Sequence, residues 1–162
     1  MKIHYMSRAE ASLIVPPKTA ALISVYEVQA EEENMKDAIA TGEVKEVDLS
    51  RWAHSVRIQF WDIDQQFQDG DNIYEPMSRE DAVKILDFIE GLPAEVDTII
   101  VHCFAGVSRS AAIAKFLMER IYDLHDEAKR VSVAYNRFVY TTLLEEWHNR
   151  KEKCHEEDEA HR

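Results

Sequence analysis

One short segment of the chain, from His102 to Ser110, combines a thiol, hydroxyls and a guanidinium at close spacing. Cys103 and Arg109 are separated by five residues, with Gly106 between them. The backbone N–H groups of such a loop, together with the N-terminus of a following helix, can form an anion site. Arg109 suits this site because its planar fork matches two phosphate oxygens, and Gly106 permits a tight turn.

An anion site that also holds a cysteine is suited to covalent chemistry. The converging N–H dipoles and the guanidinium favour the thiolate form of Cys103. A thiolate beside a bound phosphate is a nucleophile, so the expected reaction is phosphoryl transfer to sulfur, followed by hydrolysis of the phosphocysteine. Arg109 and the loop amides would neutralise the phosphate oxygens, so we expect no cofactor and no metal. The Ser110 hydroxyl is placed to assist the sulfur when it leaves.

Apolar runs around this segment predict the elements that position it. Thr98–Val101 is a continuous apolar run, typical of a buried central strand, and leads directly into the segment. Two further strands are expected at Thr19–Val25 and Val56–Trp61. Helices are expected from Ser78 to Gly91, after Ser110, from Glu127 to Phe138 and from Tyr140 to about Arg150, with a short one near Met35–Ala40. Strands that alternate with helices indicate the α/β class.

The composition predicts one globular domain. The chain has 162 residues, 46% hydrophobic and 31% charged, with a formal net charge of −12, which is ordinary for a single folded domain. We assign residues 1–150 to a catalytic domain and residues 151–162 to a polar, frayed tail. The acidic balance argues against nucleic-acid and anionic-membrane partners, which require a basic face.

The two cysteines, Cys103 and Cys154, are too few for a disulfide framework. No stretch approaches 18 consecutive apolar residues, and the N-terminal residues lack the apolar core of a secretory signal. We therefore expect a protein of the reducing cytoplasm, and we take it to be a monomer.

The motif His102-Cys103-x-x-Gly106-x-Ser108-Arg109-Ser110 resembles the signature loop of the cysteine-dependent protein tyrosine phosphatases, in their short dual-specificity form. The resemblance covers about Ala20 to Leu144 in layout and is strong only from Val101 to Ala114. It implies a three-layer α/β fold, in which helices flank a central, mostly parallel sheet of about four to five strands.

The same resemblance assigns roles to single residues. Cys103 would be the nucleophile, Arg109 would bind phosphate, His102 would help to favour the thiolate, and Ser110 would assist its departure. The loop residues that would contact the substrate phosphate are Phe104, Ala105, Gly106, Val107, Ser108 and Arg109.

In this family an aspartic acid on a separate loop protonates the leaving group. Ile58-Gln59-Phe60-Trp61-Asp62 resembles the strand that ends on this residue, so Asp62 is the first candidate and Asp64 the second. The alternative for both is a solvated strand end, while Asp69 and Asp71 are better explained as turn formers. The stretch from Gln65 to Met77 is longer than usual for the family, and we expect it to form a lid or a substrate wall.

The expected substrate is a phosphorylated protein or a small phosphomonoester. Lipid phosphatases of this superfamily carry basic residues in the loop, RNA triphosphatases usually have Asn-Arg-Thr where this chain has Ser108-Arg109-Ser110, and low-molecular-weight phosphatases have their cysteine near the N-terminus. Two other functions stay open: a catalytically silent phospho-binding module, and a sulfur enzyme similar to rhodaneses or arsenate reductases. Tyr135–Arg137 could line the site or form a helical surface.

Charge is distributed unevenly along the chain. Residues Glu27–Asp48 sum to −6, whereas residues Cys103–Arg120 sum to +2. This pattern predicts a local anion site within an acidic protein, which disfavours polyanionic substrates.

Overall fold

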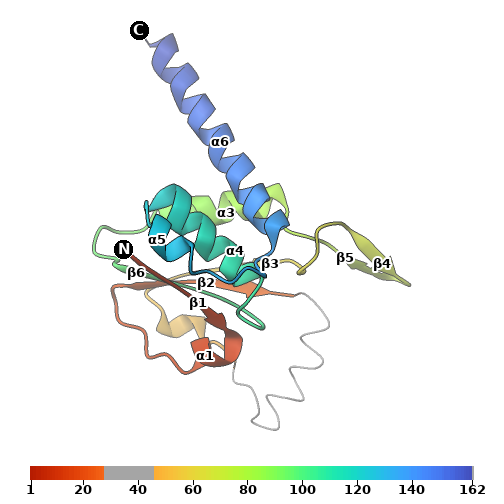
Figure 1. The fold of residues 1–162 in the computed structure, drawn as a ribbon. Helices are drawn as coiled ribbons and strands as arrows, with labels where there is room; N and C mark the ends of the chain where they lie inside the picture. Colours follow the sequence, from red (N-terminus) through yellow and green to blue (C-terminus); the bar gives the residue numbers. More distant parts are fainter. Residues whose placement is uncertain (28–45, 162) are drawn as a thin grey trace.

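The computed structural model describes residues 1–27 and 46–161 and contains a four-stranded sheet with helices on its faces (Figure 1). The strand order is β1 (Lys2–Ser7), β6 (Thr98–Cys103), β2 (Ala20–Tyr26) and β3 (His54–Gln59), and every neighbouring pair is parallel. The expected α/β class, with a parallel central sheet of about four strands, is confirmed. The short helix expected near Met35–Ala40 lies outside the described residues.

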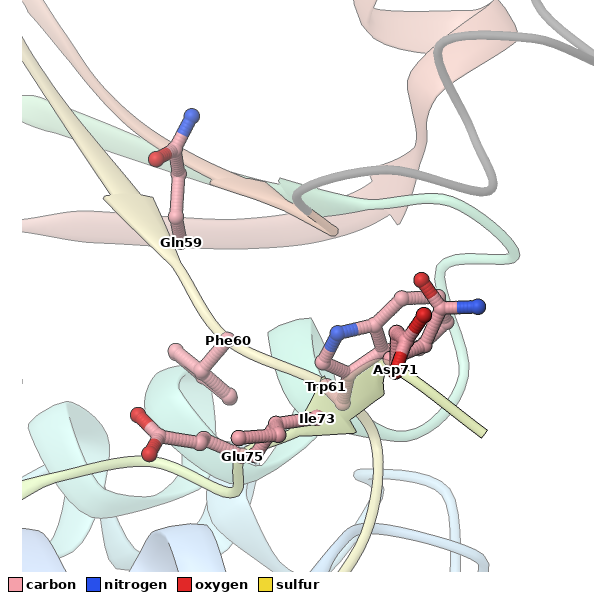
Figure 2. Close-up of a pocket in the computed structure, with 7 residues that line it drawn as sticks. Gln59, Phe60, Trp61, Asp71, Ile73 and Glu75 are labelled. Carbon is pink, nitrogen blue, oxygen red and sulfur yellow. The ribbon is translucent and has the colours of Figure 1, made fainter. Parts of the chain in front are cut away.

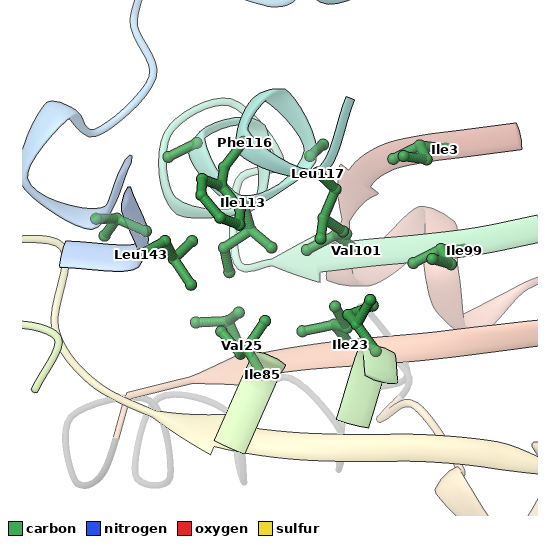
Figure 3. Packing of buried hydrophobic residues seen from close by; sticks show 14 of the residues in the cluster. Ile3, Ile23, Val25, Ile85, Ile99, Val101, Ile113, Phe116, Leu117 and Leu143 are labelled. Carbon is green, nitrogen blue, oxygen red and sulfur yellow. The ribbon is translucent and has the colours of Figure 1, made fainter. Parts of the chain in front are cut away.

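Alternation along the buried strands separates two apolar cores. Ile23 and Val101 face the larger core, which also contains residues of α3 (Arg79–Glu90), α4 (Arg109–Phe116) and α6 (Arg137–Ala160) (Figure 3). The smaller core lies on the opposite face of the sheet, where Leu22 and Ile100 pack with Ala11 of α1 (Arg8–Ser12) and with Trp52. A short 3-10 helix, η1 (Leu49–Arg51), precedes Trp52. Because successive strand side chains point to opposite faces, His102 and Cys103, the last two residues of β6, face opposite sides of the sheet.

The expected buried strands are observed, as is the expected helix after Ser78. The Ser78 hydroxyl accepts a hydrogen bond from the Asp81 N–H, and the Asp81 carboxylate accepts one from the Ser78 N–H, which together form a capping box. Strand β1 was not predicted because it lies at a sheet edge and buries only Ile3, which leaves no apolar pattern to detect.

The prediction of one helix from Glu127 to Phe138 is wrong. The structure has only one helical turn here, α5 (His125–Ala128), and irregular chain follows as far as Asn136. The Asn136 side chain accepts a hydrogen bond from the Val139 N–H and caps the start of α6. Ser132 and Asn136 favour such local hydrogen bonds over helix interiors, and β-branched valines are also weak helix formers.

The frayed tail expected after residue 150 is also not observed, because α6 continues to Ala160 and projects beyond the other elements (Figure 1). Every side chain from Lys151 to Ala160 is exposed. This stretch contains no glycine or proline and is rich in glutamate and lysine, which have good helix propensity. Helix α4 continues directly into a π-helical stretch, η2 (Leu117–Ile121).

A hairpin of β4 (Phe67–Asp69) and β5 (Asn72–Tyr74) occupies the long stretch after Asp62. The predicted turn is confirmed, and Gly70 adopts a positive φ of 59° within it. The hairpin extends outward from the end of β3 (Figure 1). Among the described residues, none of the helices has both the length and the apolar character needed to cross a bilayer.

Candidate active site

The residues of the candidate site lie at or just after the carboxyl ends of the parallel strands. Cys103 is the last residue of β6 and pairs in register with Ser7, the last residue of β1. Glu27 directly follows β2, and Asp62 lies three residues after the end of β3. Parallel strands end at one edge of their sheet, which is where α/β proteins usually bind ligands.

The segment Cys103–Arg109 joins β6 to α4 and wraps around the sulfur of Cys103; we call it the candidate loop. The thiol group is buried, and its Sγ lies 3.3 Å from the Gly106 nitrogen, which donates a hydrogen bond to it. The Ser110 Oγ lies 3.2 Å from the same sulfur, at the first turn of α4. A backbone N–H and a hydroxyl therefore contact the Cys103 sulfur close to the N-terminus of α4.

Gly106 is required by two features of this loop. Its φ is +74°, a conformation that costs other residues energy. A Cβ at this position would collide with the backbone of Met6 and Ser7 at the end of β1. The loop can therefore pack against β1 only with glycine at position 106.

Two groups from the neighbouring strand ends hold the buried Arg109 side chain. Its Nη1 donates a hydrogen bond to the Phe60 carbonyl oxygen at 3.0 Å, and its Nη2 lies 2.5 Å from Glu27 Oε1. Glu27 was not predicted at the site, because it begins a strongly acidic run that is typical of a solvated surface. Its place directly after a buried strand, at the same sheet edge as Cys103, was the available signal.

The structure brings Asp62 to the loop and leaves Asp64 apart. Asp62 Oδ1 accepts hydrogen bonds from Ser108 Oγ at 2.8 Å and from Asn136 Nδ2 at 2.7 Å. The Asn136 N–H also donates to the Ser108 carbonyl oxygen at 3.1 Å. Of the segment Tyr135–Arg137, Asn136 thus lies at the site. The exposed Asp64 has no hydrogen bond or ion pair within the part of the chain that the structure describes.

His102 faces the opposite side of the sheet from Cys103. Its Nε2 lies 2.7 Å from Ser24 Oγ, and its ring contacts the Tyr26 ring edge-on at 5.7 Å between centroids. Burial, and then the positive charge of Arg8, lowers the pKa of His102 to about 3. The imidazole is therefore neutral near neutral pH. Any influence on Cys103 must come from hydrogen bonding and packing rather than from an imidazolium charge.

The variable loop residues form an exposed, uncharged surface. Phe104, Ala105 and Val107 are exposed, and Ser108 is half-buried. The Phe104 carbonyl oxygen accepts a hydrogen bond from the Arg8 N–H at 3.2 Å, which ties the loop to the start of α1.

A pocket of about 410 Å³ lies on the hairpin side of the same strand end (Figure 2). Its lining residues are Gln59, Phe60, Trp61, Asp71, Asn72, Ile73 and Glu75. The Trp61 N–H donates to the Glu75 carbonyl oxygen at 2.9 Å, which attaches the hairpin to the chain before Asp62.

These groups can bind an anion at the loop, offer a sulfur nucleophile to it, and hold a carboxylate beside it. Within the described ranges, no group of three or more His, Cys, Asp or Glu side chains is arranged to hold a metal ion. Comparison with family models, with curated proteins and with solved structures found no match.

Proposed function

We propose that this protein hydrolyses phosphomonoesters through a phosphocysteine intermediate, as a phosphatase of the short dual-specificity type. The observation that carries the proposal is the pair of contacts made by the Cys103 sulfur. Its Sγ accepts a hydrogen bond from the Gly106 N–H and lies 3.2 Å from Ser110 Oγ. A buried cysteine that served only as core would need neither contact. The parallel sheet, with the loop between β6 and α4, is the arrangement that the resemblance implies.

In the first step, the Cys103 thiolate attacks phosphorus and the bond from phosphorus to the leaving oxygen breaks. Loop N–H groups and Arg109 stabilise the phosphoryl oxygens. Asp62, in its protonated form, gives its proton to the leaving oxygen. The hydrogen bonds that Asp62 accepts from Ser108 and Asn136 hold it at the candidate loop.

In the second step, water attacks the phosphocysteine. The Asp62 carboxylate accepts a proton from this water, and the sulfur–phosphorus bond breaks with its electron pair moving to sulfur. The Ser110 hydroxyl then donates a hydrogen bond to the departing thiolate. Inorganic phosphate leaves, and the enzyme returns to its starting state with Asp62 protonated.

The substrate we propose is a phosphorylated protein or a small phosphomonoester. The exposed loop residues Phe104, Ala105 and Val107 carry no positive charge that could hold additional phosphates. Cys103 and Cys154 are both free thiols, which fits our proposal of a monomeric protein in the reducing cytoplasm.

Steady-state hydrolysis of p-nitrophenyl phosphate tests this function. We expect turnover by the wild-type protein, and a loss of at least about a thousandfold in Cys103→Ser and a large loss in Arg109→Lys. Binding of phosphate with no turnover by the wild type would indicate a phospho-binding module instead. Turnover of thiosulfate or arsenate without phosphatase activity would indicate a sulfur enzyme.

A further inference from the structure

The pocket at the β4–β5 hairpin is lined by apolar, amide and acidic side chains; we call it the hairpin pocket. Trp61 and Ile73 provide its solvent-accessible apolar surface, whereas Phe60, which also lines it, is almost fully buried (Figure 2). The Trp61 ring packs edge-on against Tyr74 with 4.6 Å between centroids, which holds it in place. Ile73 remains about half exposed, at 54%. Such a surface can pack against the aliphatic stem of a long side chain.

The charged residues of the hairpin pocket are both carboxylates. Asp71 and Glu75 line it, and neither carboxylate has a hydrogen bond or ion pair within the described part of the chain. Residues 58–78 contain five acidic residues and no lysine or arginine. An anionic ligand would be repelled here. A purely apolar one would remove water from two carboxylates without replacing their hydrogen bonds, which is unfavourable.

The hairpin pocket and the candidate loop share one piece of chain. The Phe60 carbonyl oxygen accepts a hydrogen bond from Arg109, Trp61 lines the pocket, and Asp62 is hydrogen-bonded to Ser108. An extended peptide advances about 3.3–3.6 Å per residue. When the phosphorylated residue of a substrate peptide is bound at the candidate loop, a side chain a few positions away along that peptide can therefore reach the hairpin pocket.

We propose that the hairpin pocket binds the arginine or lysine side chain of a residue that flanks the phosphorylated residue, so that the substrates are phosphopeptide segments with a nearby basic residue. The cation would pair with Asp71 beside the Trp61 ring, and Glu75 would add to the negative potential of the hairpin pocket (Figure 2). This inference rests on the proposed phosphatase function and specifies the substrate class of the same site. It also gives the acidic hairpin a role beside an anion-binding loop.

A set of phosphotyrosyl peptides tests the inference. The peptides differ only in carrying Arg, Ala, Leu or Glu at each flanking position in turn, and kcat/KM is measured for each. We expect one position at which the Arg peptide is hydrolysed about five- to tenfold faster than the Ala peptide. In the double variant Asp71→Asn/Glu75→Gln, this ratio should fall to near one.

The matched control is Asp158→Asn/Glu159→Gln, which removes the same charge from the exposed end of α6 and should keep the Arg preference. The preference should also weaken at high salt. Equal rates for the Arg and Ala peptides, a Leu peptide faster than the Arg peptide, or a preference that survives Asp71→Asn/Glu75→Gln would each overturn the inference.

Two further measurements separate this inference from the proposed function. Wild-type turnover of p-nitrophenyl phosphate reports on the phosphatase function without any flanking residue. Dissociation constants of the same peptides for the Cys103→Ser variant report on the hairpin pocket without catalysis. If p-nitrophenyl phosphate is not hydrolysed, the phosphatase function fails, and tighter binding of the Arg peptide still supports a basic-residue pocket. If it is hydrolysed and no Arg preference exists, only the inference fails.

Discussion

Asp62 and Asp64 lie two residues apart after β3, yet only Asp62 is hydrogen-bonded to the candidate loop. The bonds come from Ser108 and Asn136, which belong to two other segments of the chain. Sequence reasoning could rank the two carboxylates by their place after a strand. It raised Tyr135–Arg137 as a segment that could line the site, but it could not pair Asn136 with Asp62, because the two are 74 residues apart in the sequence.

Asp62→Ala should lower kcat for phenyl phosphate by about a hundredfold, because the leaving phenolate loses its proton donor. The KM should change little, since the phosphate is held by the loop and Arg109. Asp64→Ala is the matched control, with an expected change below about twofold. Steady-state kinetics of both variants check this. A silent Asp62→Ala with an impaired Asp64→Ala would show that the general acid is wrongly assigned.

His102 predicts a pH dependence of stability, because its pKa is about 3 in the folded protein against an ordinary value of 6.5. Below pH 6.5 the unfolded chain binds a proton that the folded protein does not bind. The free energy of unfolding should therefore fall as the pH drops, by up to about 1.4 kcal/mol per pH unit.

Denaturant unfolding between pH 7 and about pH 5.5 measures this slope, in a range about one unit above the ordinary carboxylate pKa values. His102→Gln lacks the titrating group, so its free energy of unfolding should depend less steeply on pH, by up to about 1.4 kcal/mol per pH unit. Identical slopes for the two proteins would contradict a buried, neutral His102.

At the scale of elements, the loop between β6 and α4 depends on the end of β1. Gly106 adopts a φ of +74° and packs where a Cβ would meet the backbone of Met6 and Ser7. The motif predicted a glycine turn at this position. It did not predict β1, whose weak apolar pattern hides the strand against which the loop packs.

Gly106→Ala should destabilise the protein by more than about 2 kcal/mol and abolish turnover, because both the backbone conformation and the packing against β1 are lost. Gly70→Ala is the matched control, since Gly70 also has a positive φ but has open space around it. It should cost about 1–2 kcal/mol and leave p-nitrophenyl phosphate turnover nearly unchanged. Thermal unfolding and turnover of both variants test this, and equal effects on turnover would contradict the role given to Gly106.

Other elements show where sequence patterns succeed and fail. The buried strand β6 and helix α3 were predictable, because a continuous apolar run and a capping box are strong local signals. The prediction of a continuous helix after α5 was wrong, because the Asn136 side chain caps the start of a new helix, α6. The extension of α6 to Ala160 was not predicted, because the residues after Arg150 are polar and polar chain ends often fray.

At the scale of the whole molecule, one sheet edge gathers groups that are far apart in the sequence. Cys103 ends β6, Glu27 follows β2 and Asp62 follows β3, and only the parallel strand order places them together. The sequence predicted the class of fold and the central loop. The place of Glu27 after a buried strand indicates this sheet edge, but its pairing with Arg109 depends on the packing of β2 beside β6, which the sequence does not show.

The charge distribution separates an anion site from an acidic surface. The chain has a net charge of −12, and residues 58–78 contain five acidic side chains, whereas the candidate loop contains Arg109. Such a field disfavours polyanions and favours a phosphorylated residue with basic neighbours. The composition alone could give the first of these conclusions, whereas the second required the hairpin pocket.

The central claim, that Cys103 is the nucleophile that takes up the phosphoryl group, is tested most directly by trapping the intermediate. Wild-type protein is mixed with p-nitrophenyl phosphate, quenched in acid within the first turnover and mapped by mass spectrometry. We predict a phosphoryl group on the peptide that contains Cys103, with about one equivalent of p-nitrophenolate released in the burst, and neither in Cys103→Ser. Product formation by Cys103→Ser, or a phosphoryl group on any other residue, would contradict the claim.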